Sequence, residues 1–304
     1  YGDHRDLHSS LHDALPIYYG SIEAGGTKFV LAIADEHFNI IKKCKFSTTT
    51  PQETISKTIK YFKENRVSAI GLGSFGPIDL NLSSKTYGYI TSTPKVGWKN
   101  INLVGQLKEA LDIPIYFTTD VNASAYGEMK NTGIKNLVYL TIGTGIGGAA
   151  IQNGYFIGGI GHSEMGHQRI NRHKDDFTFE GICPFHGDCL EGVAAGPSLK
   201  ARTGILGEKI PSDDSIWDIL SYYIAQAAIN ATLTLAPECV ILGGGVMEKS
   251  NMITLTQKHF ISMLNNYIDL PCSVEKYIRL PTVKENGSAT LGNFYLAYSL
   301  FTKK

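Results

Sequence analysis

The sequence is poor in cysteine and has no excess of charge of either sign, and each shortage excludes a class of protein. Five cysteines among 304 residues are too few for a disulfide-stapled scaffold and indicate a cytoplasmic protein with reduced thiols. Lys+Arg and Asp+Glu each total 28, so neither a nucleic acid nor an anionic membrane surface is an expected partner. No apolar run reaches the roughly 18 residues that a membrane-spanning helix needs.

Residues 1–17 precede the first predicted strand and are expected to form an extension outside the folded domains. From residue 18 onward, stretches with the two-residue period of strands alternate with stretches that have the 3.6-residue period of helices. This alternation is typical of α/β proteins. Strands are predicted at 18–23, 28–34, 38–46, 67–73, 113–118, 137–142, 149–152 and 239–242, and helices at 51–65, 102–111, 215–236, 251–266 and 288–301.

A hairpin with glycines at its tip occurs twice in the chain. The first tip lies at residues 24–27 and the second at residues 143–148, each between two predicted strands. Backbone N–H groups that turn inward at such a tip form a nest for phosphate oxygens. A single tip is explained by a tight turn. Two equivalent tips in a chain of two diverged halves indicate that both bind the same polyphosphate. The expected nucleotide contacts are Gly25, Gly26, Thr27, Lys28, Thr141, Gly143, Thr144, Gly145 and Gly147.

Other interpretations of the glycine-rich stretches stay open. Lys28 either reaches a phosphate or simply points outward from its strand. The triplet Gly243, Gly244 and Gly245 follows a strand and precedes a helix, so it either flanks an adenosine or forms an ordinary turn. Residues 143–148 also match G-x-G-x-x-G, but a dinucleotide site requires a helix directly afterwards, whereas the next residues indicate a strand.

Asp120 directly follows the buried strand predicted at 113–118. As a structural residue it would cap the helix that begins there. As a catalytic residue it would accept the proton of a sugar hydroxyl whose oxygen attacks the γ-phosphorus of a nucleotide, with Mg²⁺ bridging the phosphates. A carboxylate at the carboxyl edge of a parallel sheet suits the second role.

His167, Cys183, His186 and Cys189 form a pattern that is typical of a metal site. One distant imidazole precedes a tight Cys-x-x-His-x-x-Cys turn. Two thiolates and two imidazoles suit tetrahedral Zn²⁺, and four protein ligands leave no position for a metal-bound water. The sequence therefore predicts a structural zinc ion in the loop 162–191.

These features together resemble the ROK family of sugar kinases, and within it the fructokinase branch. The resemblance covers residues 18–300 and is carried by the segments 22–28 (IEAGGTK), 120–123 (DVNA), 141–148 (TIGTGIGG), 164–167 (EMGH) and 242–245 (LGGG). It implies an actin-like ATPase fold, similar to ribonuclease H, with two duplicated α/β domains and a cleft between them. The small domain would be 18–118, with helix 288–301 packing back on it, and the large domain 119–287, with the zinc loop.

The resemblance also assigns roles to residues. It implies Asp120 as the base, and a homodimer as the usual assembly. Glu23 stands where the wider family commonly has aspartate. Thr119 stands where that family commonly has asparagine, and this loss of an amide expected to hold a pyranose hydroxyl favours fructose. The residues placed beside the sugar are Glu164, His167, Glu191, Gly76 and Asn122.

The sequence thus predicts an ATP-dependent kinase that converts D-fructose to fructose 6-phosphate, using ATP, Mg²⁺ and a structural Zn²⁺. Two alternatives remain at this point. One is a kinase for another hexose, such as mannose, glucose or an N-acyl hexosamine. The other is a non-catalytic sugar-sensing protein of the same fold.

Overall fold

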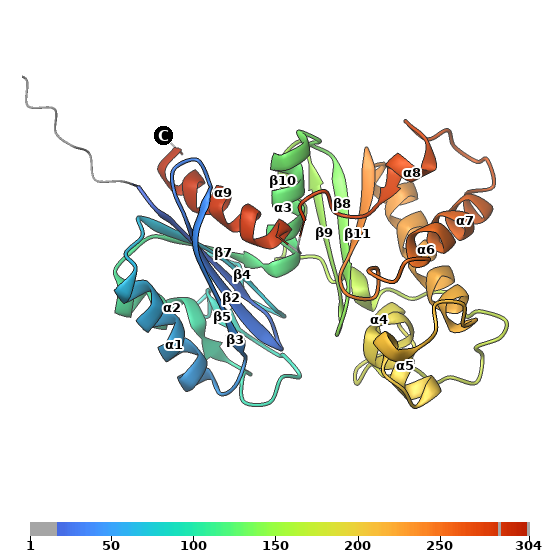
Figure 1. Ribbon diagram of the computed structural model, residues 1–304, viewed down its shortest axis with the longest axis horizontal. Coiled ribbons are helices and arrows are strands. Elements are labelled where there is room, and N and C mark those ends of the chain that lie inside the picture. The colour runs from blue at the N-terminus through green and yellow to red at the C-terminus, as the bar shows by residue number, and fades with distance from the viewer. Residues whose placement is uncertain (1–16, 285–286, 303–304) are drawn as a thin grey trace, which may run out of the picture.

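The computed structural model describes residues 17–284 and 287–302, and its strands form two five-stranded mixed sheets of identical topology (Figure 1). All of the extension expected at 1–17 except Ile17 lies outside the described residues. In order across the first sheet lie β3 (Ile40–Ser47), β2 (Lys28–Ala34), β1 (Tyr19–Ala24), β4 (Ala69–Ser74) and β7 (Ile115–Thr119). The second has β10 (Tyr155–Phe156), β9 (Ile146–Gln152), β8 (Leu137–Ile142), β11 (Cys239–Gly243) and β12 (Ile278–Arg279).

The two sheets repeat one pattern of strand directions. In each, the first three strands in chain order form an antiparallel meander, and the fourth and fifth run parallel to the first. The prediction of two diverged halves with glycine-tipped hairpins is therefore confirmed, and so is the α/β fold class.

Helices cover both faces of each sheet. On the first sheet, α1 (Pro51–Glu64) and α2 (Leu103–Leu111) share a core with one face, and α9 (Ser288–Thr302) lies on the other. On the second sheet, α3 (Asp120–Thr132) packs on one face, and α6 (Ile216–Leu235) and α7 (Met252–Leu264) lie on the other. The remaining elements are β5 (Tyr89–Ile90), β6 (Ile101–Asn102), α4 (Leu190–Ala194), α5 (Gly196–Thr203), α8 (Val274–Tyr277) and the 3₁₀ turns Met165–His167 and Gly207–Lys209.

Helix α1 shows why local sequence predicted several elements well. Thr50 is its N-cap and accepts a hydrogen bond from the Glu53 N–H group at 3.3 Å, and Pro51 occupies its first position. Ile55 and Phe62, seven residues apart, are buried on the same side of the helix. The predicted start of the helix is confirmed, and its end differs by one residue.

Helices α3 and α9 each pack on the sheet of the other half of the chain. Helix α3 directly follows β7 of the first sheet, yet its apolar side chains join the core of the second sheet. Helix α9 follows the second sheet, yet Phe294 and Ala297 pack on the first. The two helices also contact each other between the sheets, as Figure 1 shows. Both halves are therefore joined through a pair of helices as well as through the chain.

Several predicted boundaries differ by one or two residues: β4 begins at Ala69 and β7 at Ile115, each two residues later than predicted. Two further differences have a visible local cause. The second glycine turn is only Gly143–Gly145, because β9 begins at Ile146 and contains Gly147. The third strand begins at Ile40 and not at Phe38, since Phe38 has a φ of 64° and turns its ring against Tyr295 of α9. Aromatic packing with a distant helix takes Phe38 out of the strand.

Candidate active site between the two sheets

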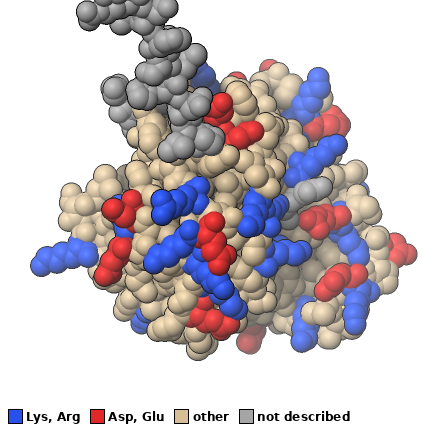
Figure 2. All heavy atoms as spheres, turned by 60° about the vertical axis from the view of Figure 1, so that its left-hand side comes forward, with Lys and Arg blue, Asp and Glu red and all other residues tan. Residues whose placement is uncertain are grey.

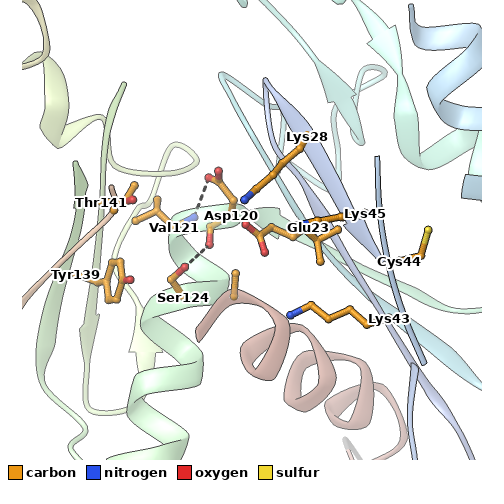
Figure 3. A pocket seen from close by; sticks show the side chains of 13 residues that line it. Glu23, Lys28, Lys43, Cys44, Lys45, Asp120, Val121, Ser124, Tyr139 and Thr141 are labelled. Atoms are coloured by element: carbon orange, nitrogen blue, oxygen red, sulfur yellow. Dashed lines mark hydrogen bonds between the residues drawn. The ribbon is translucent and has the colours of Figure 1, made fainter. Parts of the chain in front are cut away.

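A cavity of about 580 Å³ lies between the two sheets and is lined from both halves of the chain. Figure 3 shows Glu23 and Lys28 reaching it from the first sheet, and Tyr139 and Thr141 from the second. Asp120 stands between them at the start of α3. Cavities of roughly 300–1,000 Å³ that combine apolar walls with a few polar groups are the usual binding sites for small molecules.

Asp120 is the first residue of α3, at the positive end of the helix dipole. The helix N-cap is Thr119, whose hydroxyl accepts the Asn122 N–H group at 3.0 Å, so the capping role considered for Asp120 belongs to its neighbour. One carboxylate oxygen of Asp120 accepts the Val121 N–H group at 2.8 Å. Burial raises the pKa of Asp120, and the nearby Glu164 carboxylate raises it further, against the lowering effect of the Val121 amide. A partly desolvated carboxylate of this kind is suited to accept a proton.

Glu23 is the second acidic group of the cavity. Burial raises its pKa to about 7, and the neighbouring charge of Asp120 acts in the same direction, while Lys28 and Lys43 oppose the rise. Two carboxylates in one cavity and several lysines at its edge form a polar site that can hold a cation together with an anion.

The two glycine tips are tightly closed turns. In the first, the Gly25 N–H group donates to the Lys28 carbonyl at 3.0 Å, and the Thr48 hydroxyl holds the Gly25 carbonyl at 2.7 Å. In the second, the Gly143 N–H group donates to Gly145 at 2.9 Å. The amides of Gly25 and Gly143 are thus used within the turns, so the following amides, at Gly26, Thr27 and Thr144, are the better candidates for phosphate donors.

Other glycines of the predicted nucleotide set serve close packing. A methyl group on Gly145 would lie 2.6 Å from a carboxylate oxygen of Glu191, and one on Gly147 would touch the side chain of Thr141. Gly243 is the last residue of β11, and Gly244 has a φ of 89° and borders the cavity. Gly245 follows with open space around it, so this turn can approach a ligand closely.

A second polar group lies on the other side of Asp120. Gly76 follows β4, which flanks β1 opposite to β2, and a methyl group on it would lie 3.3 Å from His162 Nε2. The same His162 nitrogen lies 2.8 Å from Glu164 Oε1. His162 and Glu164 both influence the charge of Asp120. The structure thus brings the loop after β4 and the segment 162–164 together beside Asp120.

Glu191 connects this segment to the second glycine tip. Its Oε2 accepts the Ile146 N–H group at 2.8 Å, and its Oε1 lies 4.0 Å from His167 Nε2. Asn122 is buried beneath the start of α3 and donates its side-chain amide to the Thr118 hydroxyl at 3.0 Å. None of the predicted sugar contacts lines the 580 Å³ cavity, whereas Lys28, Thr141 and Gly244 of the predicted nucleotide set do. Asp120 lies between the two groups.

Sequence reasoning missed three side chains of this region: His162, Lys43 and Lys45. The Nδ1 atom of His162 is buried without a hydrogen-bond partner among the described residues. Its position two residues before Glu164 was the only local signal. Lys43 and Lys45 line the cavity from β3, and a lysine in a strand gives no sign of the cleft that it faces until the sheets are assembled.

The four predicted metal ligands converge in space. His167 Nδ1 lies 3.5 Å from Cys189 Sγ and 3.7 Å from Cys183 Sγ, and His186 Nδ1 lies 3.7 Å from Cys183 Sγ. All four ligand atoms lie within 4.8 Å of one another. Paired backbone hydrogen bonds between Cys183 and Gly187, at 2.9 and 3.1 Å, close the turn that carries Cys183 and His186, and Cys189 follows two residues later. This group of residues could hold a metal ion.

Comparisons with known proteins agree with this geometry. The family model described as "ROK family" matches residues 19–299. A fructokinase of Lactococcus lactis subsp. cremoris is 94% identical over 95% of this chain and 100% of its own length. A fructokinase of Streptococcus mutans is 56% identical over 92% of this chain and 97% of its own length.

Solved structures with low sequence identity share the fold. The ROK hexokinase of Thermus thermophilus has a TM-score of 0.75 at 21% identity, over 95% of this chain and 100% of its own. A ROK family glucokinase of Streptomyces griseus, determined in complex with glucose and AMPPNP, has a TM-score of 0.72 at 22% identity, over 93% of this chain and 99% of its own.

Proposed function

The chain belongs to the ROK family, and from this membership and the residues of the cleft we infer that it is an ATP-dependent fructokinase. The observation that carries this function is its 94% identity, over 95% of the chain, to a fructokinase. The relatives at 56% and 44% identity have the same activity. The finer points below, the position phosphorylated and the role of each residue, are our proposals.

We propose that Asp120 is the general base for phosphoryl transfer to O6 of D-fructose. The hydroxyl oxygen forms a bond to the γ-phosphorus, the bond from that phosphorus to the bridging oxygen of ADP breaks, and the hydroxyl proton passes to the Asp120 carboxylate. Support comes from the place of Asp120 between the two polar groups and from its raised pKa. Most of the rate enhancement in such transfers comes from positioning and charge stabilisation.

The nucleotide would occupy the 580 Å³ cavity, with its phosphates between the two glycine tips. Lys28 and the Thr141 hydroxyl line this cavity from opposite sheets, and Gly244 borders it beside the proposed adenosine site. Mg²⁺ bound with ATP would offset the negative charge of the phosphates, and the carboxylates of Glu23 and Asp120 would hold the ion directly or through its bound water.

The sugar would lie on the other side of Asp120, against Gly76, Glu164 and His167. The side chains of Glu164 and Glu191 are 44% and 26% exposed, so a bound sugar would be what covers them. Once covered, they would select for hydroxyl groups, because an analogue that lacks the hydroxyl leaves the acceptor unpaired. Glu191 already accepts the Ile146 amide through Oε2, so its Oε1 is the atom left for the sugar. Asn122 gives its amide to Thr118, so it would act by supporting the start of α3.

We propose that the cysteine–histidine cluster binds a structural Zn²⁺. Zinc bonds of about 2.3 Å to sulfur and about 2.0–2.1 Å to nitrogen, at tetrahedral angles, place sulfur and nitrogen ligands about 3.5 Å apart. The distances of 3.5–3.7 Å in this cluster fit that value. Binding through His167 Nδ1 leaves Nε2 facing Glu191, so the metal would hold the His167 ring in place for the sugar pocket.

We further propose a homodimer in the cytoplasm. All five cysteines are free thiols, which fits a reducing compartment. No helix among the described residues is long and apolar enough to cross a membrane.

The homodimer is proposed from exposed aromatic side chains. Tyr155 and Tyr267 are each 79% exposed, and exposed rings of this kind are enriched where protein surfaces meet. Light scattering after size exclusion tests the mass directly, and a monomer across the working concentration range would contradict the dimer.

Measuring ADP release with a panel of hexoses tests the function. We expect kcat/KM to be highest with D-fructose, lower with mannose, and lowest with glucose and N-acyl hexosamines, and we expect no turnover without Mg²⁺. Nuclear magnetic resonance of the product identifies the phosphorylated oxygen. ATP hydrolysis without any sugar, or a higher kcat/KM with another hexose, would overturn the fructokinase function, and a 1-phosphate product would overturn the O6 position.

A further inference from the structure

Three lysines, which we call the lysine row, face the nucleotide cavity from the first sheet. Lys28 stands at the start of β2, and Lys43 and Lys45 stand on the neighbouring edge strand β3. In the strand register Lys45 pairs with Val30 and Lys43 with Ala32. Every second residue of a strand points to the same face, so residues 28, 30 and 32 of β2 share one face with their partners on β3. All three lysines therefore lie on the cleft face of the sheet. Figure 3 shows Lys28 and Lys43 extending from their strands into the cavity.

The row continues away from the first glycine tip. Residues two apart in a strand are separated by about 6.8 Å, so the steps from residue level 28 to 30 to 32 span about 13 Å along the sheet. Lys28 directly follows the tip, Lys45 is one step behind it, and Lys43 is two steps behind. The cations are thus spread along one wall of the cavity and not gathered at one point.

No lysine of the row forms a close ion pair or a hydrogen bond with a side chain that the structure describes, although Lys28 and Lys43 act on the Glu23 carboxylate at longer range. Across residues 17–284 and 287–302, no carboxylate lies within 4.0 Å of Lys28, Lys43 or Lys45, and no hydrogen bond involves their amines. The carboxylates lining the cavity are Glu23 and Asp120, so the three lysines exceed the acids by one formal charge. On the outer face in Figure 2, by contrast, blue and red side chains are interspersed.

Lys42 shows what a structural lysine on the same strand does. It points to the opposite face of β3, where its amine donates to the Asn65 side chain at 2.7 Å and lies 5.8 Å from the centre of the Tyr61 ring. Lysines on an edge strand can also serve only to prevent pairing with another sheet. That role would be shared by Lys42, Lys43 and Lys45, whereas a role in the cavity belongs to Lys43 and Lys45 alone.

We propose that Lys43 and Lys45 extend the phosphate-binding wall that begins at Lys28 and hold the polyphosphate chain of the nucleotide. The wall opposite them is formed by Tyr139, Thr141 and Gly244 of the second sheet, on the side of the proposed adenosine site. Two amines on flexible stems can follow the phosphates when the cleft closes, because a lysine contacts phosphate as a point charge without fixed geometry. This inference rests on the proposed function only in placing the nucleotide in this cavity.

The test compares the double variant Lys43→Gln/Lys45→Gln with Lys42→Gln and the unchanged protein. Calorimetry measures binding of a non-hydrolysable ATP analogue with Mg²⁺, and of inorganic tripolyphosphate as a ligand without a nucleoside. We expect the double variant to bind both ligands roughly tenfold more weakly, since each exposed charge pair contributes modestly. Its affinity should also depend less on potassium chloride concentration, whereas Lys42→Gln should match the unchanged protein.

Kinetics give the second readout and separate this inference from the fructokinase proposal. In the double variant the KM for ATP should rise by a similar factor, while the KM for fructose stays within about twofold. Equal losses in the double variant and Lys42→Gln, or unchanged binding in both, would overturn the inference and leave the fructokinase function standing. A protein that binds nucleotide through the row but does not phosphorylate fructose would overturn the function and leave the inference intact.

Discussion

Asp120 combines three properties that a base for phosphoryl transfer needs. It starts α3, its carboxylate is fixed by the Val121 amide at 2.8 Å, and burial raises its pKa. The pKa rises chiefly because desolvation disfavours the charged form.

Replacing Asp120 with Asn should lower kcat with fructose by about 10²–10⁴-fold, the usual contribution of a general base. The fold should remain, because Asn still accepts the Val121 amide and Thr119 supplies the cap. Circular dichroism and the binding of the ATP analogue serve as controls. ADP release close to that of the unchanged protein would exclude Asp120 as the base.

Glu23 should make the folded protein less stable as the pH rises from about 4.5 to 7. Its pKa is 4.5 in an unfolded chain and about 7 in the fold. Between these values the unfolded chain has released the proton while the folded protein keeps it, so the unfolded state gains stability. The contribution is complete below pH 4.5 and is lost by about pH 7.

Thermal unfolding of the Glu23→Gln variant between pH 4 and 8, without nucleotide, measures this effect. Gln keeps the shape and cannot ionise, so the Tm of the unchanged protein should fall relative to the variant between pH 4.5 and 7 and run parallel to it above. A constant difference in Tm across that range would show that the pKa of Glu23 is not raised.

At the scale of elements, the loop 162–191 has two separate anchors. One is the cysteine–histidine cluster beside Glu191. The other is an ion network at Asp176, which accepts Arg202 through two hydrogen bonds of 2.8 and 2.9 Å and the Tyr223 hydroxyl at 2.8 Å. The second anchor needs no metal and ties the loop to α5 and α6.

Removing the proposed zinc ion should therefore loosen the proposed sugar side of the loop without unfolding the protein. We expect the Cys183→Ser variant, or protein treated with a chelator, to show a KM for fructose raised about tenfold or more, because the loss of even the groups that support metal ligands typically costs about 10–100-fold in metal affinity or activity. The KM for ATP should change little. Cys272→Ser, which removes an exposed thiol outside the cluster, is the control. A zinc-free protein with unchanged fructose kinetics would exclude this role of the metal.

At the scale of the whole molecule, α3 and α9 join the two halves through a close crossing. A methyl group on Gly127 would lie 2.1 Å from the Ser288 carbonyl oxygen, and one on Gly292 would lie 1.8 Å from that of Ala123. Buried Glu128 on α3 accepts the Thr282 and Val283 amides and the Ser288 hydroxyl, which fixes the chain as it enters α9. We propose that the domains divide at residues 118 and 119, with α9 as part of the small one.

Gly292→Ala should lower the free energy of unfolding by about 2–4 kcal/mol, because the helices must separate to admit the methyl group. In an isolated helix the same change would stabilise the helix by about 1 kcal/mol. A loss of stability in place of this gain would therefore indicate that the two helices cross closely at Gly292. Denaturant unfolding measures the change. Gly159→Ala, where a methyl group would meet nothing within 4 Å, is the control. A stabilised Gly292→Ala protein would contradict the crossing.

The sequence by itself determined the fold class, the two glycine-tipped hairpins and the four residues of the cysteine–histidine cluster. Each of these depends on residues close together in the chain: the short apolar run of β8, the cap and proline of α1, and the Cys-x-x-His-x-x-Cys turn. Such local patterns act through backbone geometry and ligand chemistry, so they can be read without knowing the packing.

Only the tertiary structure decided which residues share the cleft. Phe38 lies outside its predicted strand and packs on a ring of α9. Lys43 faces the cavity between the sheets, while Lys42 faces α1. His162 meets Gly76 across the chain, and Glu191 meets the second glycine tip. The physical reason is that these contacts arise when two sheets and the crossing helices α3 and α9 pack together, and burial and pKa follow from that packing.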